Sequence, residues 1–183
     1  MYIYSYAENS KVEGGETYIY SHAEIERILE KYGDTIYRAA YIQLKSRDKA
    51  DDIYQEVCIK LLRLKPRIEN EEHLKAWLLR ATIDCCKDFW KSAWYRKVTV
   101  DNQMVTEQME EKEEQAAGYL TECMQQLPGK YSAVLHLFYY EEYSIKEIAQ
   151  ILDIKENTVA SRLSRGRDKL RKILGKGGDN YEF

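Results

Sequence analysis

Apolar side chains recur every three to four residues from Ser21 onward, the spacing that gathers them on one face of an α-helix. Ser21 and Glu24 have the types and spacing of a capping box, so a helix is predicted to begin there and to end before Gly33. Three more amphipathic helices are predicted, from about residue 34, from about residue 48 to 66, and from Asn70. The inward positions of the four are Ile25, Ile28, Leu29 and Tyr32; Ile36, Ala40 and Leu44; Ile53, Val57, Leu61 and Leu64; and Leu74, Trp77, Leu78, Ala81 and Cys85.

The apolar period is lost between residues 98 and 114. Residues 101–114 hold six acidic side chains and one lysine, a composition typical of a linker. We therefore predict an all-α protein made of two small helical domains that this acidic linker joins. The first tail is rich in tyrosine, and a short hairpin and a partly ordered tail both fit it. The predicted divisions are residues 1–20 (tail), 21–97 (first domain), 98–114 (linker), 115–175 (second domain) and 176–183 (tail).

The second domain is predicted to end in a helix-turn-helix. Ser144 and Glu147 form another capping box, which begins a short helix. Asp153 follows that helix, and aspartate tolerates the left-handed backbone conformation that a tight turn needs. The helices expected in this domain span about residues 115–126, 131–139, 145–152 and 156–174.

The last helix is predicted to read DNA. At 100° per residue its apolar residues share one side, and its hydroxyl groups and two of its arginines share the other. Residues 155–176 carry eight Lys or Arg against two acids, which favours a polyanionic partner. An arginine-rich solvated helix would explain the charge, but not the capping box, the turn and the apolar spacing together. The predicted DNA-binding residues are Thr158, Ser161, Arg162, Ser164, Arg165, Arg167 and Lys169, with Val159, Leu163, Gly166 and Leu170 inward.

Little in the sequence suggests an enzyme. No phosphate-binding glycine loop and no nucleophile motif occurs, and we expect no catalytic residue, cofactor, metal site or small-molecule substrate. The four cysteines form no C-x-x-C pair, and the three histidines lie far apart, so buried cysteine side chains are the simpler interpretation. Residues 1–22 do not have the pattern of a signal peptide, and no segment has the length of a membrane span. A cytoplasmic protein without membrane insertion is expected.

Two stretches of the second domain resemble a known family. Ser144–Leu152 and Asn157–Arg167, preceded by Leu127-Pro128, closely resemble the C-terminal domain of sigma-70-type factors of the extracytoplasmic-function (ECF) group. In the first domain, Asp51–Val57 resembles the helix of that group that docks on the polymerase clamp. Trp77–Ala81, followed by Asp84 and Asp88, resembles its promoter-melting helix. The resemblance covers about residues 21–174, in the order of the family.

The resemblance implies a sigma factor that binds core RNA polymerase and directs promoter recognition and melting. Residues 21–97 would be sigma region 2, which docks on polymerase and captures a base of the minus-ten element. Residues 115–175 would be sigma region 4, which reads the minus-thirty-five element as duplex. An anti-sigma factor is a further implied partner. The implied docking residues are Asp52, Gln55 and Glu56, and the implied minus-ten residues are Lys87, Lys91, Trp94, Arg96 and Lys97.

The chain departs from the family at two positions within the motifs. Asp84 stands where the group usually has asparagine, and Ala160 stands where a basic or polar residue often contacts DNA. The tyrosine-rich tail has no counterpart in the family. The alternative function is a one-component transcriptional regulator, with an N-terminal helical sensor domain and the same C-terminal reader. That alternative leaves the docking motif without a role.

Overall fold

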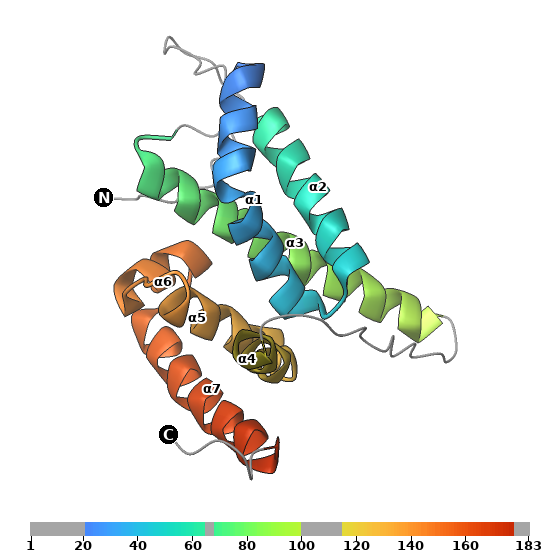
Figure 1. Ribbon diagram of the computed structural model, residues 1–183, viewed down its shortest axis with the longest axis vertical. Coiled ribbons are helices and arrows are strands. Elements are labelled where there is room, and N and C mark those ends of the chain that lie inside the picture. The colour runs from blue at the N-terminus through green and yellow to red at the C-terminus, as the bar shows by residue number, and fades with distance from the viewer. Residues whose placement is uncertain (1–20, 65–67, 100–114, 178–183) are drawn as a thin grey trace.

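The computed structural model describes residues 21–64, 68–99 and 115–177, and each regular element in these ranges is an α-helix. The predictions for the N-terminal tail and for most of the linker lie outside the described residues. The all-α class and the C-terminal helix-turn-helix are confirmed (Figure 1). The helices are α1 (His22–Leu44), α2 (Arg47–Leu64), α3 (Glu71–Thr99), α4 (Gln115–Gln125), α5 (Gly129–Tyr139), α6 (Ile145–Leu152) and α7 (Glu156–Gly177).

Helix α1 begins at the predicted capping box but continues through Gly33, so the predicted break at that residue is wrong. A glycine inside a helix costs about 1 kcal/mol relative to alanine, which is a weak preference. Tyr54 of α2 lies against this position, and a Cβ added to Gly33 would meet its hydroxyl oxygen at 3.4 Å. Packing against α2 therefore outweighs the local preference, and the missing side chain leaves room for the tyrosine ring.

Helices α1, α2 and α3 enclose the first core. Most of its buried side chains come from the predicted apolar faces, and Ala50 and Cys86, which the predicted faces do not include, are buried as well. Leu64 was predicted to point inward, but 55% of its surface is exposed. Leu64 is the last residue of α2 and belongs to neither core cluster. The apolar spacing of α2 therefore extends one turn beyond the part of the helix that packs against the core. Central residues of this core are Ile36, Ala40, Ile53, Val57, Leu61, Leu78 and Ala81.

Helices α4 to α7 form the second bundle, in which α5 and α7 pack very closely. Gly166 of α7 faces α5, and a Cβ at this position would meet Leu135 Cδ1 at 3.2 Å. The turn between α6 and α7 is made by Asp153, whose φ of 53° and ψ of 54° are left-handed, as predicted. The backbone N–H of Ile154 donates to the Ala149 carbonyl at 3.0 Å and closes the turn. These contacts fix the angle at which α7 leaves the bundle.

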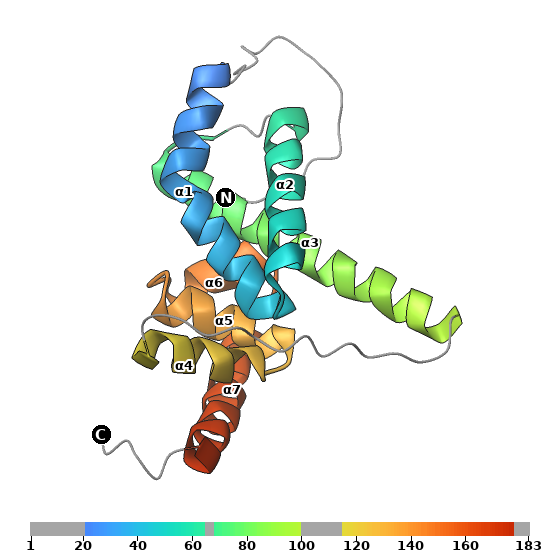
Figure 2. The ribbon, with the colours of Figure 1, turned by 45° about the vertical axis from the view of Figure 1, so that its right-hand side comes forward.

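The two bundles share a hydrophobic core. One face of α1 and α3 belongs to the same buried cluster as the inner side chains of α4, α5 and α6. Figures 1 and 2 both show α4 to α6 lying directly against α1 and α3, while α7 extends away from them. The second half of α3 likewise extends beyond the other helices in both views. The residues that α1 and α3 contribute to the shared core are Ala39, Ile42, Ala76, Leu79 and Ile83.

Polar contacts surround this shared core. Lys75 of α3 places its ammonium 2.7 Å from Glu141 Oε2, in the loop between α5 and α6. Glu141 is buried, and its other oxygen lies 3.3 Å from His136 Nε2. On the opposite side, Gln125 of α4 donates from Nε2 to the Tyr41 carbonyl at 3.1 Å. The two bundles are thus connected by charge and hydrogen bonds as well as by apolar packing.

Glu141 should make stability depend on pH. Burial opposes its ionisation, but the contacts with His136 and Lys75 outweigh burial and hold the pKa of the carboxyl below its usual value of 4.5. Its contribution is therefore complete above the unfolded-state pKa and is lost as the pH falls through the lowered folded-state pKa. We expect Glu141→Gln to lower the free energy of unfolding by about 1–3 kcal/mol at pH 7. Urea unfolding at several pH values should show this gap closing below about pH 4.5.

The matched control is Glu122→Gln, which changes an exposed carboxylate on α4. Its free energy of unfolding should stay within about 0.5 kcal/mol of the unmodified chain across the range. A gap for Glu141→Gln that is the same at pH 7 and pH 3 would contradict the role of the ionised carboxylate.

Candidate nucleic-acid and polymerase interface

Helix α7 presents the predicted reader residues to solvent. Its inner side is anchored by Val159 and Leu163, which are fully buried, and by the close contact at Gly166. The predicted polar residues lie on the remaining surface of the helix, and most of them are exposed. The exposed members are Ser161, Ser164, Arg165, Arg167 and Lys169, and the partly buried members are Thr158 and Arg162.

The predicted reader residues do not all occupy one face. Ser161, Ser164 and Arg165 lie centrally, opposite the buried side, because each residue advances by 100°. Arg167 points to a flank of the helix, and its Nε donates to the Leu163 carbonyl at 3.3 Å. Lys169 lies on the other flank, with its ammonium 5.9 Å from the centre of the Tyr131 ring. The central face is thus suited to a groove, and the two flanks to the phosphates on either side.

The arginines of α7 differ in whether they form an ion pair with a neighbouring acid. Arg171 lies 3.5 Å from Asp168, an ion pair within the helix. Arg162 and Arg165 form no ion pair within the part of the chain that the structure describes, so their guanidinium groups are available to a ligand. Asn157 is exposed in the first turn of the same helix and adds a residue that the predicted set omits. Asn157 could have been predicted from the sequence, because it lies in the first turn of the predicted recognition helix. Ala160 is exposed and offers no polar contact.

Two of the predicted minus-ten residues, Lys87 and Lys91, are exposed on the second half of α3. Each forms an ion pair with an aspartate one turn earlier in the helix. The Lys87 ammonium lies 2.8 Å from Asp84 Oδ1, and the Lys91 ammonium lies 3.0 Å from Asp88 Oδ1. The structure places Trp94, Arg96 and Lys97 on the same helix, but their side chains lie outside the described residues.

The departure at Asp84 has a local consequence. Its carboxylate lies between the Lys87 ammonium and the Arg80 guanidinium, 3.6 Å from Arg80 Nε. An asparagine at this position would remove the negative charge beside Lys87, whereas Arg80 would keep Asp153 at 3.7 Å. Exposed pairs of this kind contribute only about 0.3–0.5 kcal/mol, so a phosphate that offers stronger pairing can displace them. Asp84 thus weakens the positive potential of α3 without abolishing it.

Helix α2 presents the predicted docking residues on its outer side. Asp52, Gln55 and Glu56 are all exposed, whereas Ile53 and Val57 on the other side of the helix are buried. Ile59 and Leu62 continue the same outer face by one and two turns from Gln55, with 38% and 45% of their surfaces exposed. The sequence analysis missed both of them. Their signal was that they are apolar yet fall outside the buried stripe, which is the composition expected of an interface core.

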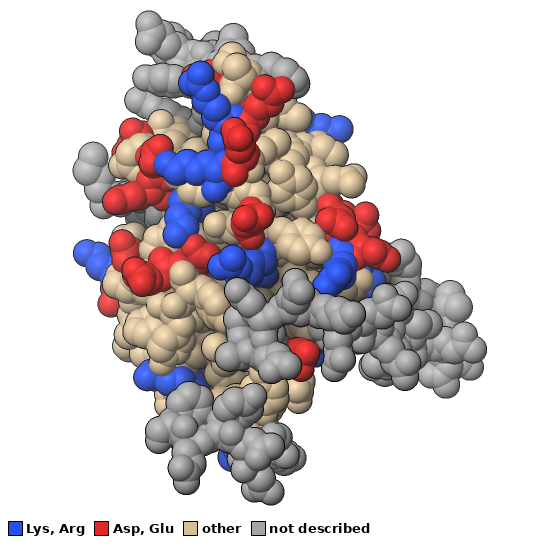
Figure 3. Space-filling view, viewed as in Figure 1, with Lys and Arg blue, Asp and Glu red and all other residues tan. Residues whose placement is uncertain are grey.

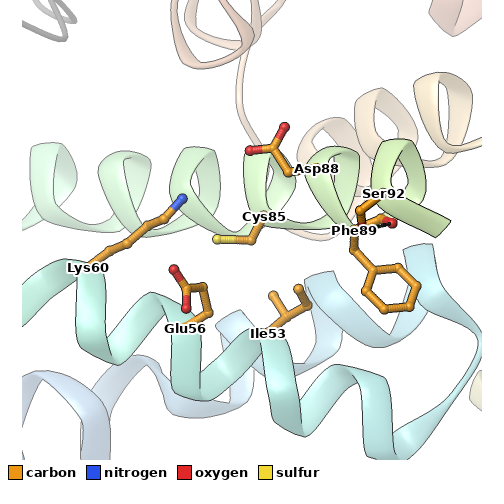
Figure 4. Close-up of a pocket in the computed structure, with 7 residues that line it drawn as sticks. All are labelled: Ile53, Glu56, Lys60, Cys85, Asp88, Phe89 and Ser92. Atoms are coloured by element: carbon orange, nitrogen blue, oxygen red, sulfur yellow. Dashed lines mark hydrogen bonds between the residues drawn. The ribbon is translucent and has the colours of Figure 1, made fainter. Parts of the chain in front are cut away.

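A groove of about 350 Å³ lies between α2 and α3, beside Glu56 (Figure 4). It combines apolar walls with three charged groups, and the Lys60 ammonium contacts the Cys85 thiol. Burial raises the pKa of that thiol, and burial raises the pKa of the neighbouring Cys86 to about 12. Both cysteines are therefore neutral side chains at physiological pH and not activated nucleophiles. The groove is lined by Ile53, Glu56, Lys60, Cys85, Asp88, Phe89 and Ser92.

The charges of the first bundle alternate in sign. On the face in Figure 3, Lys and Arg interleave with Asp and Glu over the upper half, where Figure 1 places α1, α2 and the start of α3. No helix among the described residues is long and apolar enough to cross a bilayer. The geometry defines a two-bundle helical protein with a helix-turn-helix of the DNA-binding type and a separate exposed face on α2 that mixes apolar and acidic side chains.

Comparison with known proteins identifies the family. The sigma-70 region 2 model matches residues 28–96, and the sigma-70 region 4 model matches residues 117–170. The chain is 32% identical over 162 residues to the ECF RNA polymerase sigma factor SigW of Bacillus subtilis, covering 80% of this chain and 87% of SigW. It is 30% identical over 142 residues to the RNA polymerase sigma factor SigV of the same organism, covering 76% and 84%.

Two solved structures share the fold. One is the sigma factor RpoE in complex with the anti-sigma factor NepR from Bartonella quintana, with a TM-score of 0.65, 19% identity, and coverage of 83% of this chain and 97% of that one. The other is CnrH in complex with the cytosolic domain of CnrY, with a TM-score of 0.61, 17% identity, and coverage of 86% and 92%. The protein belongs to the ECF group of the sigma-70 family, and it functions in transcription initiation. The alternative of a one-component regulator is wrong, because residues 28–96 match region 2 and not a sensor domain.

Arg165 is exposed and central on α7 and has no ion pair among the residues that the structure describes, so its removal should weaken promoter reading. We expect Arg165→Ala to cost about 1–3 kcal/mol, roughly a five- to 150-fold loss of promoter binding, if the guanidinium pairs with a guanine edge. Transcription should fall while binding to core polymerase is retained. The check is in vitro transcription at limiting holoenzyme on templates with single substitutions in the minus-thirty-five element.

Arg171→Ala is the matched control, because it removes the same charge from the same helix. A phosphate contact there should weaken binding about equally on all templates, whereas the loss at Arg165 should concentrate at one base pair. Unchanged transcription by Arg165→Ala would remove this residue from the reader set.

Gln55 and Glu56 are exposed on a helix whose other side is core, so they can be replaced without disturbing the fold. We expect the double variant Gln55→Ala with Glu56→Ala to keep its helicity and to weaken core-polymerase binding by about 1–3 kcal/mol in a quantitative pull-down. The control is Glu122→Ala with Gln126→Ala, a pair of exposed residues of the same types at the end of α4. Lost helicity in the first variant, or equal core binding by both, would refute the docking role.

Proposed function

We propose a division of labour between the two bundles of this sigma factor. Residues 21–97 act as region 2, docking on core polymerase through Asp52, Gln55 and Glu56. Residues 115–175 act as region 4, reading the minus-thirty-five element through the outer face of α7. The observation that carries this proposal is that both faces are solvent-exposed on helices whose other sides are buried in the core. Such residues are free to serve binding, since the fold does not need them.

The docking face has the chemistry of a protein interface. Ile59 and Leu62 supply exposed apolar surface beside the polar docking residues. Interfaces of this kind place apolar side chains centrally and hydrogen-bonding groups around them. The apolar pair would lose its contact with water on docking, and the acids would select a basic partner surface.

The minus-ten element is assigned to the second half of α3. Lys87 and Lys91 are exposed there, and Trp94, Arg96 and Lys97 follow on the same helix. Alternating cations and aromatic rings suit a single strand, because the cations meet phosphates and the rings stack on bases. This half of α3 extends beyond the other helices (Figure 2).

We further propose that the protein has no catalytic activity of its own and acts in the cytoplasm, where it joins the polymerase that performs the chemistry. An anti-sigma factor is a proposed second partner. Its support is that the sigma factor RpoE, which shares this fold, was solved in complex with the anti-sigma factor NepR. No cofactor, metal or small-molecule substrate is part of the proposed function.

The isolated chain should bind promoter DNA weakly. Its net charge is −3, and the basic residues of α3 and α7 are partly neutralised by neighbouring acids. Affinity for duplex grows with the number of phosphates neutralised, and two weak readers bind tightly only when a scaffold fixes their separation. A band-shift titration should therefore show weak, strongly salt-sensitive binding without core polymerase and sequence-specific binding with it. Tight binding by the free chain as a dimer on a palindrome would contradict the proposed function.

A further inference from the structure

We propose that the outer face of α2 is self-complementary and binds a second copy of this chain, with the two α2 helices packed antiparallel. The pairing itself is inferred from the exposure and the charge of this face. It rests on the proposed function in one respect, that the dimer covers the residues assigned to polymerase docking. The outer face of α2 consists of Asp52, Gln55, Glu56, Ile59, Leu62 and Arg63.

The outer face of α2 is a continuous stripe along the helix. Its members recur at intervals of three or four residues, so at 100° per residue they share one side. All six are exposed, whereas Ile53, Val57 and Leu61 on the opposite side are buried. Figures 1 and 2 show α2 at the periphery of the first bundle, and no described helix covers its outer side. The stripe is therefore accessible to another helix.

Apolar side chains form part of this stripe. Helix α2 carries three of the five large apolar side chains that are exposed among the described residues, namely Ile59, Leu62 and Leu64. Ile59 and Leu62 belong to the outer face. Packing against a second copy would remove their surfaces from water, which is the main driving force of association between proteins.

The charges of the outer face are divided between its two ends. Asp52 and Glu56 lie toward the N-terminal end, and Arg63 lies toward the C-terminal end. None of the three forms an ion pair with another residue that the structure describes. The exposed acids of α3 differ, because Asp84 and Asp88 each pair with a lysine. A face that is acidic at one end and basic at the other complements its own copy when the second helix runs in the opposite direction.

The antiparallel arrangement has a defined register. With a two-fold axis that crosses α2 beside Ile59, Glu56 lies opposite Arg63 of the second copy, and the symmetry repeats this pair. The two Ile59 side chains then meet next to the axis. Leu62 of each copy lies near Gln55 of the other. This arrangement gives an apolar centre with charged pairs at its rim, which is the usual composition of a protein interface.

The size of the face makes the dimer weak and reversible. The face extends over about three turns of one helix, which is at the low end of the range of protein interfaces. We expect a dissociation constant on the order of 100 µM. Because the dimer covers Gln55 and Glu56, one α2 cannot hold a second copy and core polymerase at the same time. Polymerase therefore competes with self-association, and the monomer is the form that docks.

Reciprocal charge reversal tests the pairing. Arg63→Glu and Glu56→Arg each place like charges opposite one another in a dimer of one variant, whereas a mixed dimer of the two variants regains both ion pairs. Sedimentation equilibrium of the unmodified chain should show a dimer that grows with concentration. The dissociation constant of each variant alone should rise roughly tenfold, and an equimolar mixture of the two should recover the unmodified value.

Lys146→Glu and Glu122→Arg are the matched controls, because they make the same changes of net charge at exposed positions of α6 and α4. Each control, and their mixture, should sediment like the unmodified chain. An unmodified chain that is monomeric up to millimolar concentration would overturn the proposal. So would a mixture of Arg63→Glu and Glu56→Arg that dimerises no better than either variant alone.

Core polymerase, added without DNA, tests the competition. At a chain concentration at which the dimer predominates, sedimentation velocity should give a complex with one chain per polymerase. Two chains per polymerase would overturn the mutual exclusion. Failure of the proposed function would be seen separately, as a chain that passes the charge-reversal test but directs no promoter-specific initiation with core polymerase.

Discussion

The burial of one face of α1 and α3 beneath α4 to α6 is the contact on which the rest of this structure depends. Each bundle has fewer than about 80 residues, a size at which one core contributes only a few kcal/mol. Ala39, Ala76 and Leu79 add apolar burial that neither bundle has alone. The same contact sets the relative orientation of α2 and α7.

Neighbouring acids partly neutralise the basic side chains of α3 and α7. Asp84 and Asp88 hold the lysines of α3, and Asp168 holds Arg171. Exposed pairs of this kind are weak and yield to a phosphate, so they lower non-specific attraction more than specific binding. The ion pair of Glu141 differs from these exposed pairs because its carboxylate is buried. Its pair with Lys75 lies largely away from solvent, where screening is small, and it joins the two bundles.

Local signals predicted most of the secondary structure and the candidate reader. The two capping boxes, at Ser21 and Ser144, begin helices as expected, and Asp153 adopts the left-handed conformation that the turn requires. These features are encoded within a few residues, since a cap joins a side chain to a backbone N–H three positions away. The buried and exposed sides of α7 likewise follow from its helical period, with Val159 and Leu163 inside and Arg165 outside.

The sequence by itself determined the helices, the recognition turn and the faces that meet solvent, because each of these depends on neighbours within one or two turns. Only the tertiary structure decided that α1 runs through Gly33, because Tyr54 of α2 supplies the compensating contact. It also decided that the two bundles share a core, joined by Arg80 and Gln150 across 70 positions of sequence. Periodicity shows that a face is apolar but not what covers it, since burial depends on which distant surface is complementary in shape and charge.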